Sequence, residues 1–338
     1  MLQLKIEAIK WETPDTATFF LSEISGKNIQ YKAGQFITLV FAHHDEEIRR
    51  SYSLSSSPDE DFLAITVKRI TNGEISRFML TKLKPGDILH AVEPAGRFVI
   101  TDSDIERDIF LFAAGSGIVP VYAQLKYALG RKGKSRFILI FSNQDEASIL
   151  FRNQLHALAL AHPDRLQIIH LLSNEANRLN NIRVEQLVQQ NISFGLEQAQ
   201  FYLCGPFTYM RMVKITLGFM GIEPGQIRKE NFVIDTVAVK ENITVYPPGR
   251  VRIHYRGELY DITVGENQSI LQAALQNKVQ LPYSCRTGMC STCMALCKGG
   301  KVIMAENDVL TANELAQGWI LTCTGHPVGD DAVITFDQ

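Results

Sequence analysis

Short hydrophobic runs separated by polar turns fill the first hundred residues of the chain. Each run is rich in β-branched and aromatic residues and is too short for a typical helix, which is the pattern of strands joined by turns. The runs cover residues 3–11, 16–22, 35–41, 50–56, 62–70 and 87–94. Many short strands without intervening helices are typical of an antiparallel barrel. The pattern predicts an antiparallel β-barrel domain over residues 1–103.

The pattern changes after residue 107, where strands alternate with helices. Four apolar runs read as strands, at residues 108–114, 136–142, 166–172 and 200–204. Between them, residues 119–129 and 146–161 repeat apolar positions at helical spacing. Strands that alternate with helices form a parallel sheet covered by the helices. We therefore predict an α/β parallel-sheet domain over residues 104–232.

A proline-rich stretch, "KENITVYPPGR", interrupts all periodicity before the last ninety residues. It predicts a linker over residues 233–249. The chain then shows two β-rich runs around Arg256-Gly257, a helical run at 269–277, and a second predicted hairpin turned by Gly299-Gly300. These elements predict a third domain over residues 250–338 and, for the whole chain, a multidomain α+β protein.

Composition and charge are those of an ordinary globular protein. The 338 residues are 46% hydrophobic and 21% charged, with a net charge of −2, which gives no electrostatic reason for a nucleic-acid partner. Lys5, Glu7 and Lys10 interrupt the N-terminal stretch where a signal peptide needs an apolar core. The most apolar run, from Ile109, is too short to span a bilayer. We expect a soluble cytoplasmic protein that binds neither membrane nor nucleic acid.

Four of the six cysteines lie between residues 285 and 297. Cys285, Cys290 and Cys293 are spaced C-x4-C-x2-C, and Cys323 follows later, which is the ligand spacing of a plant-type [2Fe–2S] cluster. Disulfides are rare in the cytoplasm, so the cluster of thiols favours metal binding or redox chemistry. A structural zinc site stays the alternative, although such sites usually contain a second CxxC or a histidine pair. Cys297 is expected to be a small buried hydrophobe on a strand.

Two further motifs lie in the barrel region. Arg50, Ser51, Tyr52 and Ser53 form an R-x-Y-S motif on a predicted strand, and a G-E-I-S motif at residues 73–76 opens a helical stretch. Backbone N–H groups at a helix start bind anions, and a guanidinium can pair with a phosphate through two hydrogen bonds. The motifs together predict a pyrophosphate site. The alternative is that Tyr52 belongs to the barrel core and Arg50 is a surface charge.

The α/β region carries two motifs at predicted strand ends. Gly115-Ser116-Gly117 joins the first strand to a helix, where glycines let the backbone approach a dinucleotide pyrophosphate. Pro120 occupies the third position of the usual G-x-G-x-x-G fingerprint. Cys204-Gly205-Pro206 ends the last strand, at the edge where parallel sheets bind ligands. An inert buried thiol is the alternative for Cys204.

In this order the motifs R-x-Y-S, G-x-x-S, G-S-G-I-x-P and C-G-P resemble the ferredoxin–NADP reductase superfamily. With the C-terminal cysteines, the chain resembles its three-domain oxygenase reductases over essentially the whole length, and "PAGRF" (94–98) and "KENF" (229–232) match further landmarks. The resemblance implies an NAD(P)H-dependent oxidoreductase that passes electrons through FAD and a [2Fe–2S] cluster to a partner protein such as an oxygenase component. A hybrid-cluster protein or a small molecule is the alternative acceptor. A non-enzymatic iron–sulfur or zinc protein would leave R-x-Y-S and C-G-P unexplained.

The resemblance also implies roles for particular residues, without a catalytic acid, base or nucleophile. Ser53 would lie near flavin N5 and Cys204 beside the nicotinamide. The residues implied for FAD are Arg50, Ser51, Tyr52, Ser53, Gly73, Ile75, Ser76, Glu230 and Phe232. Those implied for NAD(P)H are Gly115, Ser116, Gly117, Cys204, Gly205 and Pro206. Cys285, Cys290, Cys293 and Cys323 fall on the four cluster-ligand positions.

The chain departs from its relatives after residue 143. Many relatives have an arginine there, which can hold the 2′-phosphate of NADPH, whereas this chain has Gln144, Asp145 and Glu146. The departure predicts weak discrimination between the two nucleotides or a preference for NADH.

Overall fold

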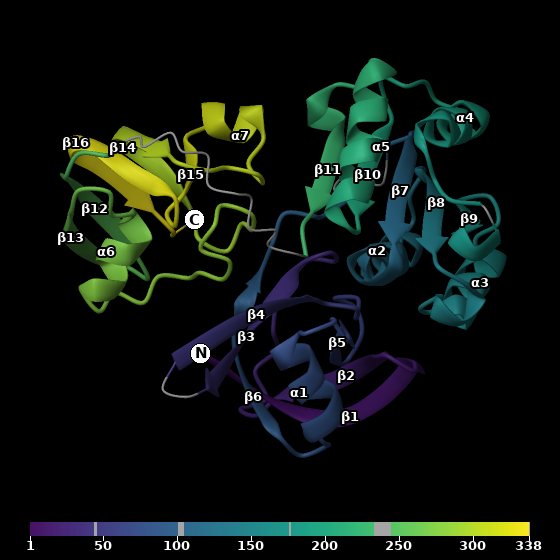
Figure 1. The fold of residues 1–338 in the computed structure, drawn as a ribbon, viewed down its shortest axis with the longest axis horizontal. Coiled ribbons are helices and arrows are strands. Elements are labelled where there is room, and N and C mark those ends of the chain that lie inside the picture. Colours follow the sequence, from purple (N-terminus) through teal and green to yellow (C-terminus); the bar gives the residue numbers. More distant parts are fainter. Residues whose placement is uncertain (44–45, 101–104, 176, 233–244, 338) are drawn as a thin grey trace. The chain divides into compact units, whose positions relative to one another are not determined.

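The computed structural model describes residues 1–43, 46–100, 105–175, 177–232 and 245–337. It divides into two compact units, Met1–Phe232 and Val233–Gln338, each of which is described by itself (Figure 1). The first unit contains the two predicted N-terminal domains, here called the barrel lobe and the α/β lobe. Residues 101–104, where we placed their boundary, and residues 233–244 of the predicted linker lie outside the described residues.

The barrel lobe is built from a six-stranded antiparallel sheet in the order β4-β3-β6-β1-β2-β5. An isolated bridge between Leu54 and Ile65 joins the chain next to β4 with β5. Side chains alternate along β1, where Leu2, Leu4 and Ile6 are buried and the residues between them are exposed. The elements are β1 (Leu2–Thr13), β2 (Thr16–Glu23), β3 (Phe36–His43), β4 (Glu46–Ser53), β5 (Leu63–Lys68), α1 (Glu74–Lys82) and β6 (Ile88–Ala95). The predicted barrel strands are confirmed.

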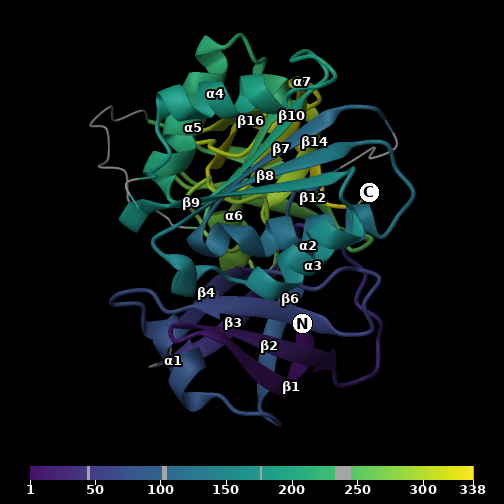
Figure 2. The ribbon, with the colours of Figure 1, turned by 90° about the vertical axis from the view of Figure 1, so that its right-hand side faces the viewer.

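The α/β lobe is a five-stranded parallel sheet in the order β11-β10-β7-β8-β9. Its elements are β7 (Asp108–Ala114), α2 (Ile118–Leu129), β8 (Arg136–Asn143), α3 (Arg152–Ala161), β9 (Leu166–Leu172), α4 (Asn181–Asn191), β10 (Gln200–Cys204), α5 (Phe207–Phe219) and β11 (Ile227–Glu230). Helices α2 and α3 cover one face and α4 and α5 the other (Figure 2). Since both faces are covered, β7 is apolar at successive positions rather than alternating.

The predicted helix over residues 146–161 is wrong in its first part. Residues Glu146–Ser148 form a single 3-10 turn, and α3 begins at Arg152. The Asp145 carboxylate accepts the Ser148 backbone N–H at 2.9 Å, which closes a local turn, and Phe151 adopts a left-handed φ of 56°. Burial of Ile149, Leu150 and Phe151 in the lobe's core gives this stretch its apolar residues without a helix.

The second unit is a mixed five-stranded sheet in the order β13-β12-β16-β14-β15. Its elements are β12 (Gly249–Tyr255), β13 (Glu258–Val264), α6 (Ile270–Gln276), β14 (Met294–Met304), α7 (Ala312–Ala316), β15 (Trp319–Leu321) and β16 (Gly325–Thr335). The hairpin at Arg256-Gly257 is confirmed, and both turn residues have positive φ. Helix α6 is also confirmed.

The second predicted hairpin, at Gly299-Gly300, is wrong. Strand β14 runs without a turn and pairs with β16, and the register shifts at Gly299 mark bulges in one strand. Gly300 has a φ of 67°, and a Cβ there would lie 2.7 Å from the backbone of Ala332. The glycines therefore let two strands approach each other instead of reversing the chain. Cys297 is half-buried beside the bulge, not in the interior as expected, and its thiol donates to the Gly299 carbonyl at 3.2 Å.

None of the described helices has both the length and the hydrophobicity needed to span a membrane.

Replacing Gly300 by alanine is expected to destabilise the second unit by about 2–4 kcal/mol, because a left-handed backbone and a steric conflict with β16 add together. Gly257→Ala is the matched control: it also has positive φ, 76°, but no atom lies within 4 Å of the position that its methyl group would occupy. That control should cost only about 1–2 kcal/mol. Urea unfolding of both variants measures the difference, and equal losses would contradict the bulge interpretation.

Candidate functional site

The carboxyl ends of three neighbouring parallel strands bring the α/β motifs together. Cys204 at the end of β10 lies in register with Ala113 of β7 on one side and Glu230 of β11 on the other. The 115–117 turn follows β7 directly. Chain order reverses at β7, because β8 and β9 lie to one side of it and β10 and β11 to the other. Such a reversal point is where open α/β sheets bind ligands.

The two glycine motifs pack against each other through their backbones. A Cβ on Gly117 would collide with the carbonyl of Cys204, and one on Gly205 would lie 2.9 Å from the Cβ of Ala114. Any larger residue at position 117 would push the turn away from β10. The 115–117 turn thus lies beside Cys204 and Gly205, with Pro206 next in the chain, and binding of NAD(P)H by these residues stays a prediction.

The start of α2 is suited to a phosphate group. No side chain caps it, and its first turn contains no acidic residue. The Ile118 N–H already donates to the carbonyls of Gly115 and Ser116, so the helical run begins at the 115–117 turn, and the positive end of its dipole favours an anion there. Pro120 lacks an N–H, so it removes one donor without disturbing the helix. The turn and helix start fit the pyrophosphate of a dinucleotide.

The ends of β10 and β11 disfavour negative charge. Burial raises the pKa of the Cys204 thiol, and the nearby Glu230 raises it further. Burial also raises the pKa of Glu230 to about 8. Because this folded-state pKa lies above the ordinary value of a carboxyl group, the protonated form favours the fold, and this contribution is lost as pH rises through 8. Burial thus disfavours the ionised form of both groups.

The Cys204 side chain is fully buried in the core on the α2 face of the sheet. It is the backbone of Cys204 and Gly205 that meets the nucleotide turn. Contact between the thiol and a nicotinamide stays a prediction. Tyr209, in the first turn of α5, was missed by the sequence analysis: its hydroxyl donates to the Ala113 carbonyl at 3.3 Å, and burial raises its pKa. Its place just after the C-G-P motif is the signal that could have identified it.

The R-x-Y-S residues occupy the end of β4. Arg50 and Ser51 are exposed, Tyr52 is half-buried at the edge of the barrel core, and Ser53 is buried. The Arg50 guanidinium donates to the Arg49 carbonyl at 2.8 Å. Burial raises the pKa of Tyr52. An exposed guanidinium beside a partly exposed ring can meet a phosphate and a planar group on the same strand. The same arrangement also fits the alternative of a core tyrosine and a surface charge.

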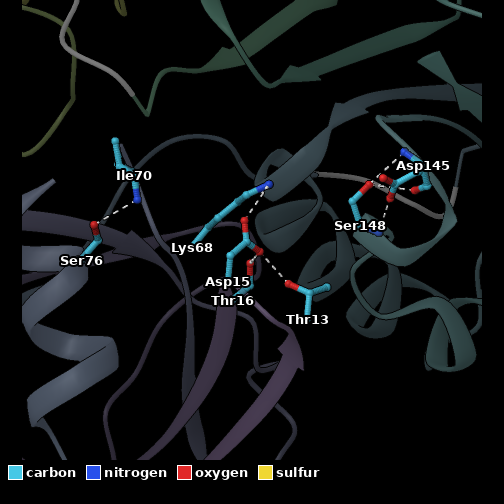
Figure 3. Close-up of polar contacts among 8 residues, drawn as sticks. All are labelled: Thr13, Asp15, Thr16, Lys68, Ile70, Ser76, Asp145 and Ser148. Carbon is cyan, nitrogen blue, oxygen red and sulfur yellow. Dashed lines mark hydrogen bonds and ion pairs between the residues drawn. The ribbon is translucent and has the colours of Figure 1, made fainter. Parts of the chain in front are cut away.

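Ser76 shapes the loop before α1 rather than pointing away from it (Figure 3). Its hydroxyl accepts the Ile70 N–H at 3.1 Å and donates to the Gly73 carbonyl at 3.3 Å. A Cβ on Gly73 would lie 2.6 Å from that hydroxyl, so the loop requires glycine. Helix α1 has no side-chain cap, which leaves the N–H groups of its first turn, including those of Ile75 and Ser76, as candidate phosphate donors.

Glu230 and Phe232 close the first unit. Glu230 is half-buried at the end of β11, and Phe232 is 40% exposed. Glu230 is the partner of Cys204 on the neighbouring strand, and Phe232 follows two residues later in the chain. Their contact with the flavin stays a prediction.

The four predicted ligand cysteines meet in the second unit. The Cys285 thiol lies close to those of Cys290 and Cys323, and the Cys293 thiol lies close to that of Cys323. These contacts lower the pKa of Cys285 and raise that of Cys323. The Thr287 backbone N–H also points to the Cys285 sulfur, at 3.4 Å. A backbone donor to sulfur stabilises a thiolate ligand.

The loop around the thiols is held by backbone contacts. Gly288 has a φ of 76°, and a Cβ there would lie 2.7 Å from the Glu306 carbonyl. Thr322, also missed by the sequence analysis, donates both its N–H and its hydroxyl to the Cys293 carbonyl, at 3.1 and 2.9 Å. Its position next to Cys323 was the available signal. Thr322 thereby couples the third and fourth cysteines.

The donor set fits an iron–sulfur cluster better than zinc. The donors that gather here are all thiols, from the four cysteines. His326, the first histidine after Cys323, is engaged elsewhere: its Nδ1 lies 2.8 Å from the Gln268 carbonyl and its ring stacks on Tyr246. A [2Fe–2S] cluster needs four cysteines around two irons.

Sequence models of three protein families match successive parts of the chain. The oxidoreductase FAD-binding domain matches residues 3–100, the oxidoreductase NAD-binding domain residues 111–215, and the 2Fe-2S iron-sulfur cluster binding domain residues 253–328. The three matches coincide with the barrel lobe, the α/β lobe and the second unit.

Sequence similarity to known proteins covers the whole chain. The ferredoxin reductase component of 3-ketosteroid-9-alpha-monooxygenase from Mycolicibacterium smegmatis is 32% identical, covering 100% of this chain and 98% of that protein. One of the subunits of 1,2-phenylacetyl-CoA epoxidase from Escherichia coli is 31% identical, covering 99% and 97%.

Two solved structures share the fold. Phthalate dioxygenase reductase has a TM-score of 0.62 at 22% identity, covering 99% of this chain and 97% of that one. An intact type IV self-sufficient cytochrome P450 monooxygenase has a TM-score of 0.73 at 21% identity, and this chain spans 40% of that longer polypeptide.

Arg50→Ala is expected to weaken FAD binding about tenfold to hundredfold, because a charge-assisted hydrogen bond to phosphate contributes about 1.5–3 kcal/mol. Fluorescence titration of flavin-depleted protein with FAD measures the dissociation constant. Lys5→Ala, which removes an exposed cation of the same lobe, is the control. Equal affinities of the two variants would show that Arg50 is only a surface charge, and extraction of FMN from the purified protein would contradict the choice of FAD.

Proposed function

We infer the function of this chain from its family: it belongs to the oxygenase reductases that join FAD-binding, NAD-binding and 2Fe-2S cluster binding domains in one polypeptide. It is an NAD(P)H-dependent oxidoreductase that passes electrons through FAD and a [2Fe–2S] cluster to a partner protein. The observation that carries this conclusion is the match of all three domains, in order and over the whole chain, to reductase components of oxygenases.

We assign the electron route to three sets of residues. Arg50, the edge of Tyr52 and the start of α1 hold FAD, and the 115–117 turn with the start of α2 holds the nicotinamide nucleotide. The four cysteines hold the cluster. When bound, FAD takes two electrons as hydride and releases them one at a time, which a [2Fe–2S] centre requires. The protein's own task is to orient these groups and to disfavour negative charge at the strand ends of Cys204 and Glu230.

The acceptor we propose is an oxygenase component. The relatives are named as reductase components of a monooxygenase and as a subunit of an epoxidase, and this chain has the same three domains in the same order.

We place the protein in the cytoplasm, because its six cysteines are all free and a set of thiol ligands suits a reducing compartment.

We also propose that the electron donor is NADH. Strand β8 lies next to β7, so residues 144–146 leave the sheet beside the nucleotide turn. The backbone and carboxylate of Asp145 are fixed by three hydrogen bonds with Ser148, at 2.7–3.1 Å (Figure 3). A carboxylate can accept a ribose 2′-hydroxyl and repels a 2′-phosphate. Glu146 pairs with Arg152 at 3.0 Å, which compensates its charge, so Asp145 is the carboxylate that would repel a 2′-phosphate.

The wild-type protein is expected to show a kcat/KM at least about tenfold higher with NADH than with NADPH, since an unpaired phosphate beside a carboxylate costs about 1–3 kcal/mol. Gln144→Arg should shift the ratio toward NADPH by roughly tenfold, by supplying a cation for the 2′-phosphate. Gln144→Ala is the control that removes the amide without adding charge. A hundredfold preference of the wild type for NADPH would contradict the assignment.

The electron route predicts a separation of two activities. The purified protein should contain roughly two irons per chain, and Cys290→Ser should abolish the visible absorbance of the cluster. That variant should still reduce ferricyanide, a small oxidant that can reach the flavin, but should lose most of its reduction of cytochrome c. Protein acceptors meet the cluster through a small transient interface. Cytochrome c reduction at the wild-type rate, or a colourless zinc-containing wild type, would refute the final step of the route.

A further inference from the structure

The barrel lobe and the α/β lobe are joined by an ion pair between Lys126 and Glu60. The Lys126 Nζ lies 2.5 Å from Glu60 Oε2, and the backbone N–H of Ser57 donates to the same oxygen at 2.7 Å. The side chains are 15% and 29% exposed, so solvent screens the pair much less than an ordinary surface pair. Glu60 is thus held from both sides, by its own loop and by α2.

The pair connects the two segments that follow the candidate flavin and nucleotide residues. Glu60 lies in the loop that follows β4, whose end carries Tyr52 and Ser53. Lys126 lies on α2, which begins directly after the 115–117 turn. A helix is a stiff spacer of about 1.5 Å per residue, so the position of Lys126 sets the position of the turn. The contact therefore fixes the nucleotide turn relative to the flavin strand.

The surroundings of Lys126 also come from both lobes. The Tyr122 ring, one helical turn earlier on the same face, lies 4.6 Å from the ammonium. Burial and the nearness of Glu60 and Glu12 raise the pKa of Tyr122 to about 12. Desolvation lowers the pKa of Lys126, and the hydrogen bond with Glu60 opposes that shift. The ammonium is held between an aromatic face and a carboxylate.

A second contact joins α2 to the chain segment that follows the barrel strands. The Gln124 side-chain amide donates to the carbonyl of Phe98, and a Cβ on Gly34 would collide with both groups. Phe98 packs edge-to-face on Tyr202 of the α/β lobe, with ring centres 5.5 Å apart. The chain that leaves the barrel is thereby attached to the other lobe, and Lys126–Glu60 adds a further contact along α2.

The same interface offers an exposed ion pair for comparison. Arg131, beyond the end of α2, pairs with Asp59, the neighbour of Glu60, but these side chains are 43% and 52% exposed. Exposed pairs are screened by solvent and contribute little. The two pairs join the same loop to the same part of the chain. They differ in burial and in geometry, because Arg131 contacts Asp59 through two nitrogens and Lys126 contacts Glu60 through one.

We propose that Lys126 and Glu60 are positioning residues for hydride transfer, which set the approach of the nicotinamide to the flavin through α2 and the loop after β4. This inference rests on the proposed function. Hydride transfer needs the reacting atoms about 3–3.5 Å apart, and a displacement of about 1 Å can cost roughly a hundredfold in rate. A half-buried ion pair is poor evidence for a gain in stability, because desolvation offsets its attraction, so a role in geometry is its better explanation.

The test compares Lys126→Met with Arg131→Met in the full-length holoprotein. Rapid mixing with saturating NADH gives the rate of flavin reduction, and titration gives the dissociation constant of the nucleotide. Amide hydrogen exchange of residues 115–126 and 55–61 reports the interface without any turnover. Lys126→Met should slow flavin reduction at least about tenfold, leave the nucleotide dissociation constant within about twofold, and speed exchange in both segments. Arg131→Met should change none of the three.

The double variant Lys126→Met/Glu60→Gln separates positioning from folding. Removing both charges abolishes the unpaired carboxylate that the single variant leaves, so the melting temperature should recover. Flavin reduction should nevertheless stay slow, because the link between the lobes is absent. Recovery of the rate together with stability, or equal effects of Lys126→Met and Arg131→Met, would overturn the proposal. A wild-type protein that failed to reduce its flavin with NADH would instead refute the proposed function.

Discussion

The approach of Gly117 to the carbonyl of Cys204 is the contact on which the first unit depends. It brings the turn after β7 against the end of β10, at the point where strand order reverses. A side chain at residue 117 would separate the two motifs and tilt α2, which starts there. Since α2 also carries Gln124 and Lys126, the same contact determines how the α/β lobe meets the barrel lobe. One close backbone contact thus connects the nucleotide turn, the sheet and the interface.

Sequence periodicity predicts well those elements in which the pattern of apolar residues follows the pattern of burial. β1 alternates because one face meets the core, and β7 is uniformly apolar because helices cover both faces. The helix prediction failed at Ile149–Phe151, because apolar composition does not distinguish a helix from a buried irregular stretch. The path of the chain there depends on the Asp145–Ser148 turn and on the left-handed backbone of Phe151. The hairpin prediction failed at Gly299-Gly300, because two glycines signal either a turn or a close approach, and only the partner strand decides which.

The residues of the candidate site also divide into those that the sequence predicts and those that it does not. Motifs at strand ends are predictable because parallel strands place their carboxyl ends at one edge. Lys126 and Glu60 were not predictable, because they are 66 residues apart and each residue type is ordinary on a surface. Tyr209 and Thr322 also escaped, since each acts through a backbone carbonyl and neither belongs to a motif. Lys126 and Glu60 therefore carry no local signal of their role, whereas Tyr209 and Thr322 had only their positions beside a motif.

Glycine has a common purpose at all three candidate sites. A Cβ would meet the Ser76 hydroxyl at Gly73, the Cys204 carbonyl at Gly117 and the Glu306 carbonyl at Gly288. The packing of the polypeptide therefore demands each of these glycines before any ligand is considered, so a glycine motif alone does not establish a phosphate or cluster site. Two other features make these loops suitable for ligands. Helices α1 and α2 start without side-chain caps, and a backbone N–H is directed at the Cys285 sulfur. The backbone donors, held in place by the glycines, are the groups that bind charge.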